Sequence, residues 1–157
     1  MNILIEGPDG SGKTTLAKML NTLTGFRVLP SMGPVNATDP EARQLLAIER
    51  KKWYLALNGL DNLIIDRSFF ISEYIYGKIF RNHSYVSFKE LTDYILELTD
   101  NGDAIIFCTH LYNHEEETRK DTKLEKMATE RQKEVATFYE TLRETLALDW
   151  YGKYFEV

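Results

Sequence analysis

The sequence predicts an α/β fold of three layers, in which helices cover both faces of a parallel sheet of about five strands. Short apolar runs alternate with longer segments of helical periodicity along the whole chain, and a glycine-rich turn follows the first apolar run. With 157 residues and a single cysteine, the chain is long enough to bury one core without disulfides. We therefore expect residues 1–157 to form one domain.

The first strand, helix and second strand are the most clearly marked. Asn2–Glu6 is a short apolar run of the kind found in buried parallel strands. Apolar residues from Leu16 to Leu23 then recur at helical spacing, until Gly25 ends the helix. Phe26–Leu29 predicts the second strand, which leads into a loop rich in proline and glycine.

The later elements follow from the same patterns. Asp39 and Pro40 are typical of a cap and a first helical residue, and the helix they begin ends at Asn58-Gly59. A third strand, Leu63–Ile65, is followed by Asp66. The remaining predicted elements are helices at 69–80 and 88–98, a strand at 104–108, a helix from Met127 through Leu146 and a terminal strand at 154–157.

Charge and composition limit the possible partners. The chain carries 19 basic and 24 acidic residues, a formal net charge of −5, which argues against broad binding to nucleic acid or anionic membranes. It has no cysteine pair, no basic and apolar leader, and no apolar run approaching about 18 residues. We expect a cytoplasmic protein that binds neither nucleic acid nor membrane, so any polyanion must bind at a local site.

The most informative motif directly follows the first predicted strand. Residues 7–14 read Gly-Pro-Asp-Gly-Ser-Gly-Lys-Thr and match G-x-x-x-x-G-K-[ST] between a strand and a helix. Such glycines let successive backbone N–H groups point at phosphate oxygens. Lys13 would reach the β- and γ-phosphates, Thr14 would supply a hydroxyl for Mg²⁺, and Thr15 would donate to the α-phosphate. We expect ATP and Mg²⁺ as ligands, with the binding residues Gly7, Asp9, Gly10, Ser11, Gly12, Lys13, Thr14 and Thr15.

The end of the third strand narrows the class of phosphate-loop protein. A GTP-dependent switch would need Asp-x-x-Gly there and a later Asn-Lys-x-Asp, and neither motif is present. A motor ATPase usually shows an acidic pair, whereas this strand ends in Asp66-Arg67. Arg67 would hold an anionic group in bidentate fashion, while Asp66 anchors Mg²⁺ through water or fixes the arginine. The pair favours a kinase of small phosphorylated acceptors.

At these positions the sequence resembles the thymidylate kinase family of nucleoside monophosphate kinases. Residues 7–15 are similar to that family's G-x-D-G-x-G-K-T-T, and Leu63–Arg67 is similar to its strand ending in Asp-Arg-Tyr. Leu45–Arg50 resembles the family's leucine-rich helix, and Arg131–Leu142 resembles the helix that follows its mobile lid. The resemblance implies a P-loop nucleotide kinase fold and a homodimer.

The resemblance also implies roles for individual residues. Asp9 would lie between the acceptor sugar and the metal, Arg67 would hold the acceptor phosphate, and Arg50 would approach the acceptor base or phosphate. Where the family has glycine after the loop aspartate, as Gly10 is here, the lid supplies a catalytic arginine. Arg119 is the first candidate for it, followed by Lys120, Lys123 and Arg131.

Two segments allow two interpretations each. The charged run within residues 113–126 is either a solvated face or a lid that closes over ATP and excludes water. The aromatic residues after Arg67 are mostly core, but one of Phe69, Phe70 or Tyr74 is expected to face the acceptor base. Phe70 and Tyr74 are the predicted substrate contacts.

The kind of acceptor is predicted from the absence of a catalytic general base after the second strand. A 5′-hydroxyl needs a general base, whereas a monophosphate oxygen is already anionic at neutral pH. No carboxylate lies between the second strand and Asp39, so we expect ATP to phosphorylate a deoxynucleoside monophosphate. Two alternatives stay open. A deoxynucleoside kinase is suggested by Asp66-Arg67-Ser68, which is similar to Glu-Arg-Ser. A non-catalytic nucleotide-binding regulator is suggested by the divergent loop at 31–34 and the missing closing helix.

Overall fold

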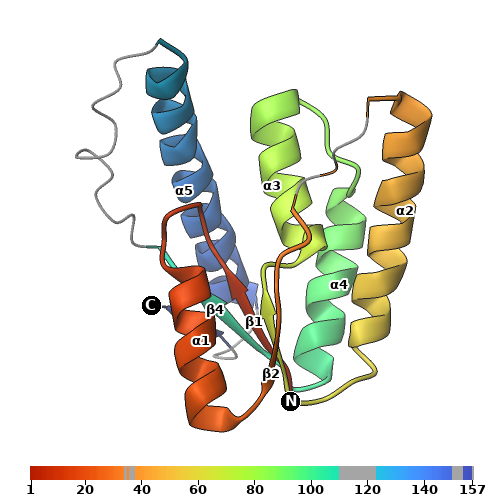
Figure 1. Ribbon diagram of the computed structural model, residues 1–157, viewed down its shortest axis with the longest axis vertical. Coiled ribbons are helices and arrows are strands. Elements are labelled where there is room, and N and C mark those ends of the chain that lie inside the picture. The colour runs from red at the N-terminus through yellow and green to blue at the C-terminus, as the bar shows by residue number, and fades with distance from the viewer. Residues whose placement is uncertain (34, 36–37, 110–122, 150–153, 157) are drawn as a thin grey trace.

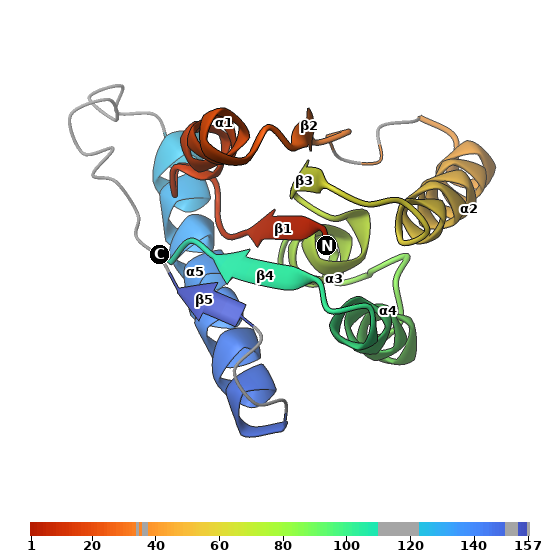
Figure 2. The same cartoon turned by 90° about the horizontal axis from the view of Figure 1, so that it is seen from below.

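A computed structural model describes residues 1–33, 35, 38–109, 123–149 and 154–156. Its core is one parallel sheet with the strand order β2-β3-β1-β4-β5, which Figure 2 shows from top to bottom. The strands are β1 (Ile3–Glu6), β2 (Arg27–Leu29), β3 (Leu63–Asp66), β4 (Ala104–Phe107) and β5 (Tyr154–Glu156). The helices are α1 (Lys13–Thr24), α2 (Pro40–Leu57), α3 (Phe69–Arg81), α4 (Phe88–Asp100) and α5 (Lys123–Asp149).

Helices cover both faces of the sheet, as the sequence predicts. Alternate residues of a strand point to opposite faces, so Ile3 and Ile5 of β1 pack with Ala17 of α1, while Leu4 packs on the other side. That second and larger core includes buried residues of α2, α3, α4 and α5. Because both faces are covered, the central strands are apolar throughout except at their carboxyl ends.

The carboxyl ends of β1 and β3 meet at one place in the fold. Ile5 is paired with Asp66, and Glu6 is paired with Phe107 on the other neighbouring strand. β2 and β3 lie on one side of β1 in the sheet, and β4 lies on the other side, so the strand order reverses at β1. Ligands of open α/β sheets bind beside such a reversal. In Figure 1 this region lies between α1 and α3.

Some boundaries differ from the predicted ones. α5 begins at Lys123 rather than at Met127, because polar residues continue the helix beyond its apolar period. Asp39 occupies the position before α2 in an extended conformation, but its side chain makes no capping hydrogen bond, and Pro40 begins the helix. Within the described segments, no helix combines the length and the apolar character that crossing a membrane requires.

Candidate nucleotide-binding site

The loop between β1 and α1 has the backbone shape of a phosphate cradle. Gly12 precedes α1 with a φ of 83°, in the left-handed region that glycine adopts without strain. Because glycine has no side chain, only the backbone of Gly12 stands in front of the helix. Gly7 lies so close to β4 that a Cβ atom there would stand 2.3 Å from the carbonyl oxygen of Cys108. These two glycines turn the chain so that the loop and the positive end of α1 face the same space.

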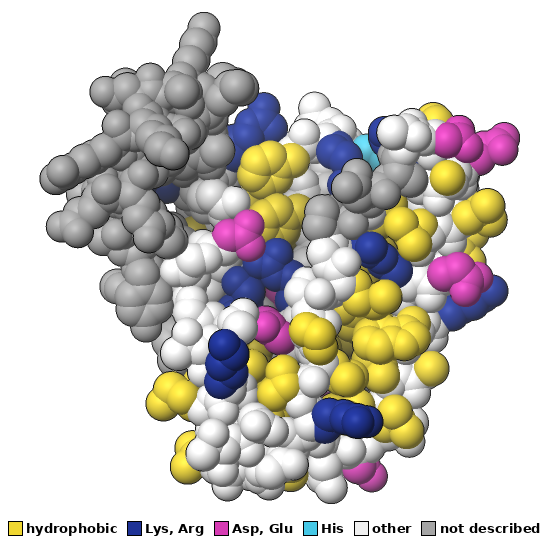
Figure 3. Space-filling view, in the orientation of Figure 1, with side chains coloured by type: hydrophobic (Ala, Val, Ile, Leu, Met, Phe, Trp, Pro, Cys, Tyr) yellow, Lys and Arg dark blue, Asp and Glu magenta, His cyan; other side chains and the backbone are white. Residues whose placement is uncertain are grey.

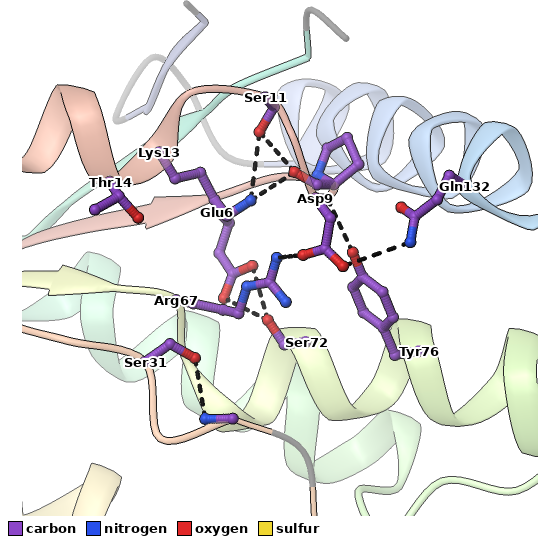
Figure 4. Close-up of polar contacts among 12 residues, drawn as sticks. Glu6, Asp9, Ser11, Lys13, Thr14, Ser31, Arg67, Ser72, Tyr76 and Gln132 are labelled. Carbon is purple, nitrogen blue, oxygen red and sulfur yellow. Dashed lines mark hydrogen bonds and ion pairs between the residues drawn. The ribbon is translucent and has the colours of Figure 1, made fainter. Parts of the chain in front are cut away.

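Lys13 lies buried within this loop. Its Nζ donates to the carbonyl oxygen of Pro8 at 2.5 Å and to Oγ of Ser11 at 3.4 Å (Figure 4). Burial and the nearby cation of Arg67 lower the pKa of Lys13 to about 8, although the surrounding carboxylates oppose that change. Without a ligand, then, the charge of Lys13 is poorly stabilised, and an anion placed in the loop would supply the missing partner.

Binding of ATP is therefore expected to take up protons in alkaline solution. At pH 8.5 a lysine with a pKa near 8 is mostly neutral, and a bound triphosphate favours its charged form, so roughly 0.7 proton should be absorbed per ATP. Titration calorimetry in buffers of different ionisation enthalpy measures this uptake, which should vanish near pH 6.5. Lys13→Arg keeps its charge at both pH values and should take up none. Equal uptake at both pH values in the unaltered protein would contradict the assignment.

Thr14 and Asp66 lie where a magnesium ion would be expected. Oγ1 of Thr14 donates to Oδ2 of Asp66 at 2.9 Å, joining the first turn of α1 to the end of β3. Both side chains would offer Mg²⁺ oxygen atoms of the kind that it accepts as ligands. No cluster of three His, Cys, Asp or Glu residues suited to a metal occurs in the part of the chain that the structure describes. The Thr14 hydroxyl and the Asp66 carboxylate match the oxygen donors that Mg²⁺ prefers.

Arg67 follows β3 in a strained conformation. Its φ of 78° is unusual for a residue with a side chain, and such strain costs about 1–3 kcal/mol. Hydrogen bonds to its backbone hold it there, since its N–H donates to Ile5 O at 3.0 Å and its carbonyl accepts from the Tyr54 side-chain hydroxyl at 3.1 Å. The guanidinium forms an ion pair with Asp9 and lies 5.1 Å from the ring centroid of Tyr76.

The charge of Arg67 is secured by its surroundings. Burial alone would lower the pKa of Arg67, but the hydroxyls of Tyr139 and Tyr76 and the carboxylates of Glu6 and Asp9 together raise it. Asp9, the ion-pair partner of Arg67, makes two further hydrogen bonds. Its N–H donates to the Tyr76 hydroxyl at 3.0 Å, and its Oδ2 accepts from Gln132 at 3.4 Å (Figure 4). Arg67 is therefore a permanent cation at the edge of the loop.

Glu6 is a site residue that the sequence prediction missed. It is fully buried at the end of β1, and its carboxylate accepts from Ser68 N at 2.6 Å, Ser72 Oγ at 3.2 Å and Tyr139 Oη at 2.7 Å. Burial raises the pKa of Glu6, while Arg67 opposes the rise. Glu6 thereby connects β1 with α3 and α5 beneath Arg67. A charged residue ending an otherwise apolar strand was the signal for it.

Two adjoining cavities open around these residues. The first, which we call the loop cavity, has a volume of about 370 Å³ and lies against the phosphate loop. The second, the α3 cavity, has a volume of about 170 Å³ and lies beside α3 and the loop after β2. Both are lined by Asp9, Ser31 and Arg67. Figure 3 shows charged side chains gathered in this hollowed middle of the face. The arrangement offers room for two ligands that meet at Arg67.

Most of the predicted phosphate-binding residues come together in the loop cavity. The residues that line it, apart from Ser31, were all predicted: Asp9, Gly10, Gly12, Lys13, Thr14, Thr15, Asp66 and Arg67. Ser11 is buried behind the loop, where its hydroxyl donates to Pro8 O at 2.7 Å. The structure also places Arg50 near the α3 cavity, where its guanidinium donates to the carbonyl of Gly33 at 2.5 Å. Arg50 thus holds the loop that forms one wall.

Of the three aromatic residues considered for the acceptor base, Phe69 lines the α3 cavity, whereas Phe70 and Tyr74 lie elsewhere. Phe70 is buried in the core and stacks on Tyr94 with a centroid separation of 4.4 Å. Tyr74 packs against the rings of Phe88 and Phe138. Neither lines the α3 cavity, because helical geometry turns a different face of α3 toward it. The residues of α3 on that face follow the spacing i, i+3, i+4, i+7: Phe69, Ser72, Glu73 and Tyr76. The same spacing also fits the opposite face of α3, so no sequence signal set these four residues apart.

Most of the predicted lid lies outside the described residues. Arg119 and residues 113–122 lie outside the described residues, and 123–126 belong to the start of α5. Further along α5, Arg131 donates to the carbonyl of Ile79 at 3.1 Å and lies over the ring of Phe80. Among the described residues of α5, Gln132 is the one that hydrogen-bonds to Asp9 of the loop.

The architecture matches solved structures of nucleotide-bound proteins. No family model matches the sequence, and no curated protein does either. YorR protein from Bacillus subtilis, solved in complex with phosphorylated GDP, has a TM-score of 0.68 at 17% identity, covering 100% of this chain and 85% of that one. Deoxyadenosine kinase from M. mycoides, solved with its products dCMP and a flexible dCDP, has a TM-score of 0.61 at 19% identity, covering 100% and 90%. The chain shares the fold of these proteins.

Proposed function

We propose that this protein transfers the γ-phosphoryl group of ATP to a deoxynucleoside monophosphate. The observation that carries the proposal is the position of Arg67, a permanent cation where the loop cavity meets the α3 cavity. A triphosphate in the first cavity and a monophosphate in the second would present their reacting groups to each other at this point. The fold shared with deoxyadenosine kinase from M. mycoides supports the same reaction class.

The residues of the loop would bind the donor. Backbone N–H groups of residues 7–13 and the start of α1 hold the phosphates, and Lys13 neutralises charge that develops toward the leaving oxygen. Thr14 and Asp66 would hold Mg²⁺, which when bound neutralises charge on the β- and γ-phosphates. Residues 113–126 are proposed as a lid over the donor, with Arg119 as its catalytic arginine.

Arg67 would act on the acceptor. Its guanidinium would hold the acceptor phosphate and reduce the repulsion between two anionic reactants. Because a monophosphate is already ionised at neutral pH, no general base is required. Asp9, which is held by Arg67 and Gln132, would bind the acceptor sugar at the edge of the metal site. Arg50 would act through the backbone of residues 32 and 33, which it holds against the α3 cavity.

A deoxynucleoside kinase is the second candidate. The Asp9 carboxylate lies at the junction of the two cavities, where it could accept the proton of a 5′-hydroxyl. Deoxyadenosine kinase is among the proteins that share the fold. Against this candidate, the Asp9 carboxylate is already engaged in an ion pair with Arg67.

An assay of ADP release tests the proposal. The protein with ATP and Mg²⁺ should phosphorylate at least one common deoxynucleoside monophosphate and none of the corresponding nucleosides, with chromatography identifying the diphosphate product. Turnover of nucleosides alone would establish the second candidate instead. Binding of both nucleotides without any product would indicate a non-catalytic regulator. Lys13→Ala, purified in parallel, controls for contaminating kinases.

A further inference from the structure

The strained backbone turn at Arg67 is held by side chains from other parts of the chain. A non-glycine residue at a φ of 78° keeps that conformation only where the surrounding contacts fix it. The carbonyl of Arg67 accepts a hydrogen bond from the Tyr54 hydroxyl of α2 at 3.1 Å. The next backbone N–H, that of Ser68, donates to Oε1 of Glu6 at 2.6 Å. Glu6 therefore closes the turn from the end of β1.

Glu6 belongs to the core and not to either ligand cavity. It is 0% exposed, and the side chains that line the loop cavity and the α3 cavity do not include it. Its carboxylate also accepts hydrogen bonds from the hydroxyls of Ser72 at 3.2 Å and Tyr139 at 2.7 Å, so α3 and α5 both fix its position. Figure 4 shows the bond to Ser72 beside the Arg67 side chain. The ion pair of the Arg67 guanidinium is made with Asp9, so Glu6 acts on Arg67 through the backbone of the next residue.

We propose that Glu6 is a positioning residue for the acceptor phosphate: by accepting the Ser68 N–H it fixes the strained turn that aims the Arg67 guanidinium into the junction of the two cavities. The inference rests on the proposed function, in which Arg67 holds that phosphate. A buried N–H that loses its acceptor is costly, and without this bond one of the contacts that hold the turn is gone.

Two substitutions separate the hydrogen bond of Glu6 from its charge. Glu6→Gln removes the charge but keeps the reach, so its carbonyl oxygen still accepts from Ser68. Its NH₂ group can donate to the hydroxyl oxygens of Ser72 and Tyr139, because a hydroxyl is both donor and acceptor. Glu6→Asp keeps the charge, but its side chain is one methylene shorter and withdraws the carboxylate from Ser68. The proposal therefore predicts a defect in the aspartate variant and not in the glutamine variant.

Titration calorimetry with dAMP, dCMP, dGMP and dTMP in turn gives the first test. Glu6→Asp should bind the preferred monophosphate at least about 10-fold more weakly than the unaltered protein, since a group misplaced by about 1 Å can cost more than that. Glu6→Gln should stay within about threefold, because it retains the hydrogen bonds. ATP with Mg²⁺ should bind Glu6→Asp within about threefold of the unaltered protein, since the loop cavity is formed by the loop's own backbone.

The order of these affinities decides the outcome. Glu97→Asp, the same change at an exposed position on α4, should alter neither affinity. An unchanged monophosphate affinity in folded Glu6→Asp would overturn the proposal. Weaker binding by Glu6→Gln than by Glu6→Asp would overturn it too, because the charge would then be what acts on Arg67. A parallel loss of ATP affinity in Glu6→Asp would assign Glu6 to packing of the whole site.

Hydrogen exchange at the Ser68 amide, followed by nuclear magnetic resonance, tests the turn without any ligand. Exchange should be at least about 10-fold faster in Glu6→Asp than in the unaltered protein and in Glu6→Gln, and equal rates would overturn the proposal. If no monophosphate binds the unaltered protein, the proposed function fails, while this rate still decides whether Glu6 holds the turn. If Glu6→Asp does not fold, Glu6→Gln decides: retained monophosphate affinity and slow exchange support the proposal, and loss of either overturns it.

Discussion

Replacing Lys13 with methionine is expected to remove phosphoryl transfer and yet to raise the melting temperature of the nucleotide-free protein. The lost cation should lower kcat/KM by about 10²–10³-fold, as for other groups that stabilise transition-state charge. Stability should rise because burial lowers the pKa of Lys13 in the folded state to about 8 from 10.5. Below pH 8 the buried charge of the amine opposes folding. Methionine removes this charge and still fills the space of the aliphatic part of the lysine side chain.

The stability gained by Lys13→Met should depend on pH. The unfolded chain binds more protons than the folded one between about pH 8 and 10.5, so the unaltered protein gains stability across that range. The advantage of Lys13→Met, about 1–3 kcal/mol at pH 7, should therefore shrink as the pH rises. Thermal unfolding followed by circular dichroism at several pH values measures it. Lys18→Met, at an exposed position of α1, should show neither effect. A lower melting temperature for Lys13→Met would contradict the prediction.

The second large effect is expected at Arg67. Arg67→Ala should lower kcat/KM for the monophosphate acceptor by about 10³-fold or more, because the cation at the junction of the two cavities is lost. Arg67→Lys should recover only part of this loss, since an ammonium ion cannot bind a phosphate in bidentate fashion. Steady-state kinetics with varied acceptor concentration measure both variants.

Arg67→Ala should also destabilise the protein by about 1–3 kcal/mol, because the buried Glu6 carboxylate loses its nearby cation. Arg27→Ala removes an exposed arginine at the start of β2 and serves as the matched control. Near-normal turnover by a folded Arg67→Ala protein would exclude the assigned role. A loss of stability without any loss of turnover would make Arg67 a structural partner of Glu6 alone.

The sequence was most informative where local chemistry determines structure. The apolar runs predicted β1, β3 and β4 to within one or two residues, because a strand covered on both faces must be apolar throughout. Gly25 ends α1 in the left-handed conformation that its position required. The phosphate loop, too, is local, since its glycines and Lys13 act within a few residues of one another.

The α3 cavity was predicted less well, for a geometric reason. Phe70 and Tyr74 were expected to contact the acceptor, but the direction in which a helix presents its residues depends on how it packs. α3 packs against α5 and α4 so that Phe70 enters the core while Glu73 and Tyr76 face the cavity. No spacing within 69–80 alone distinguishes these two faces, because both are rich in aromatic residues.

The α/β class, the phosphate-binding loop and the position of Asp66 and Arg67 at a strand end all follow from local sequence patterns. The surroundings of Arg67 depend instead on how the elements pack. Glu6 of β1, Asp9 of the phosphate loop and Tyr76 of α3 meet there because β1 and β3 end side by side and α3 follows β3 directly. The same holds for the buried carboxylate of Glu6, whose hydrogen-bond donors lie 62 to 133 residues away in the sequence. Such long-range contacts arise from packing, which no local pattern encodes.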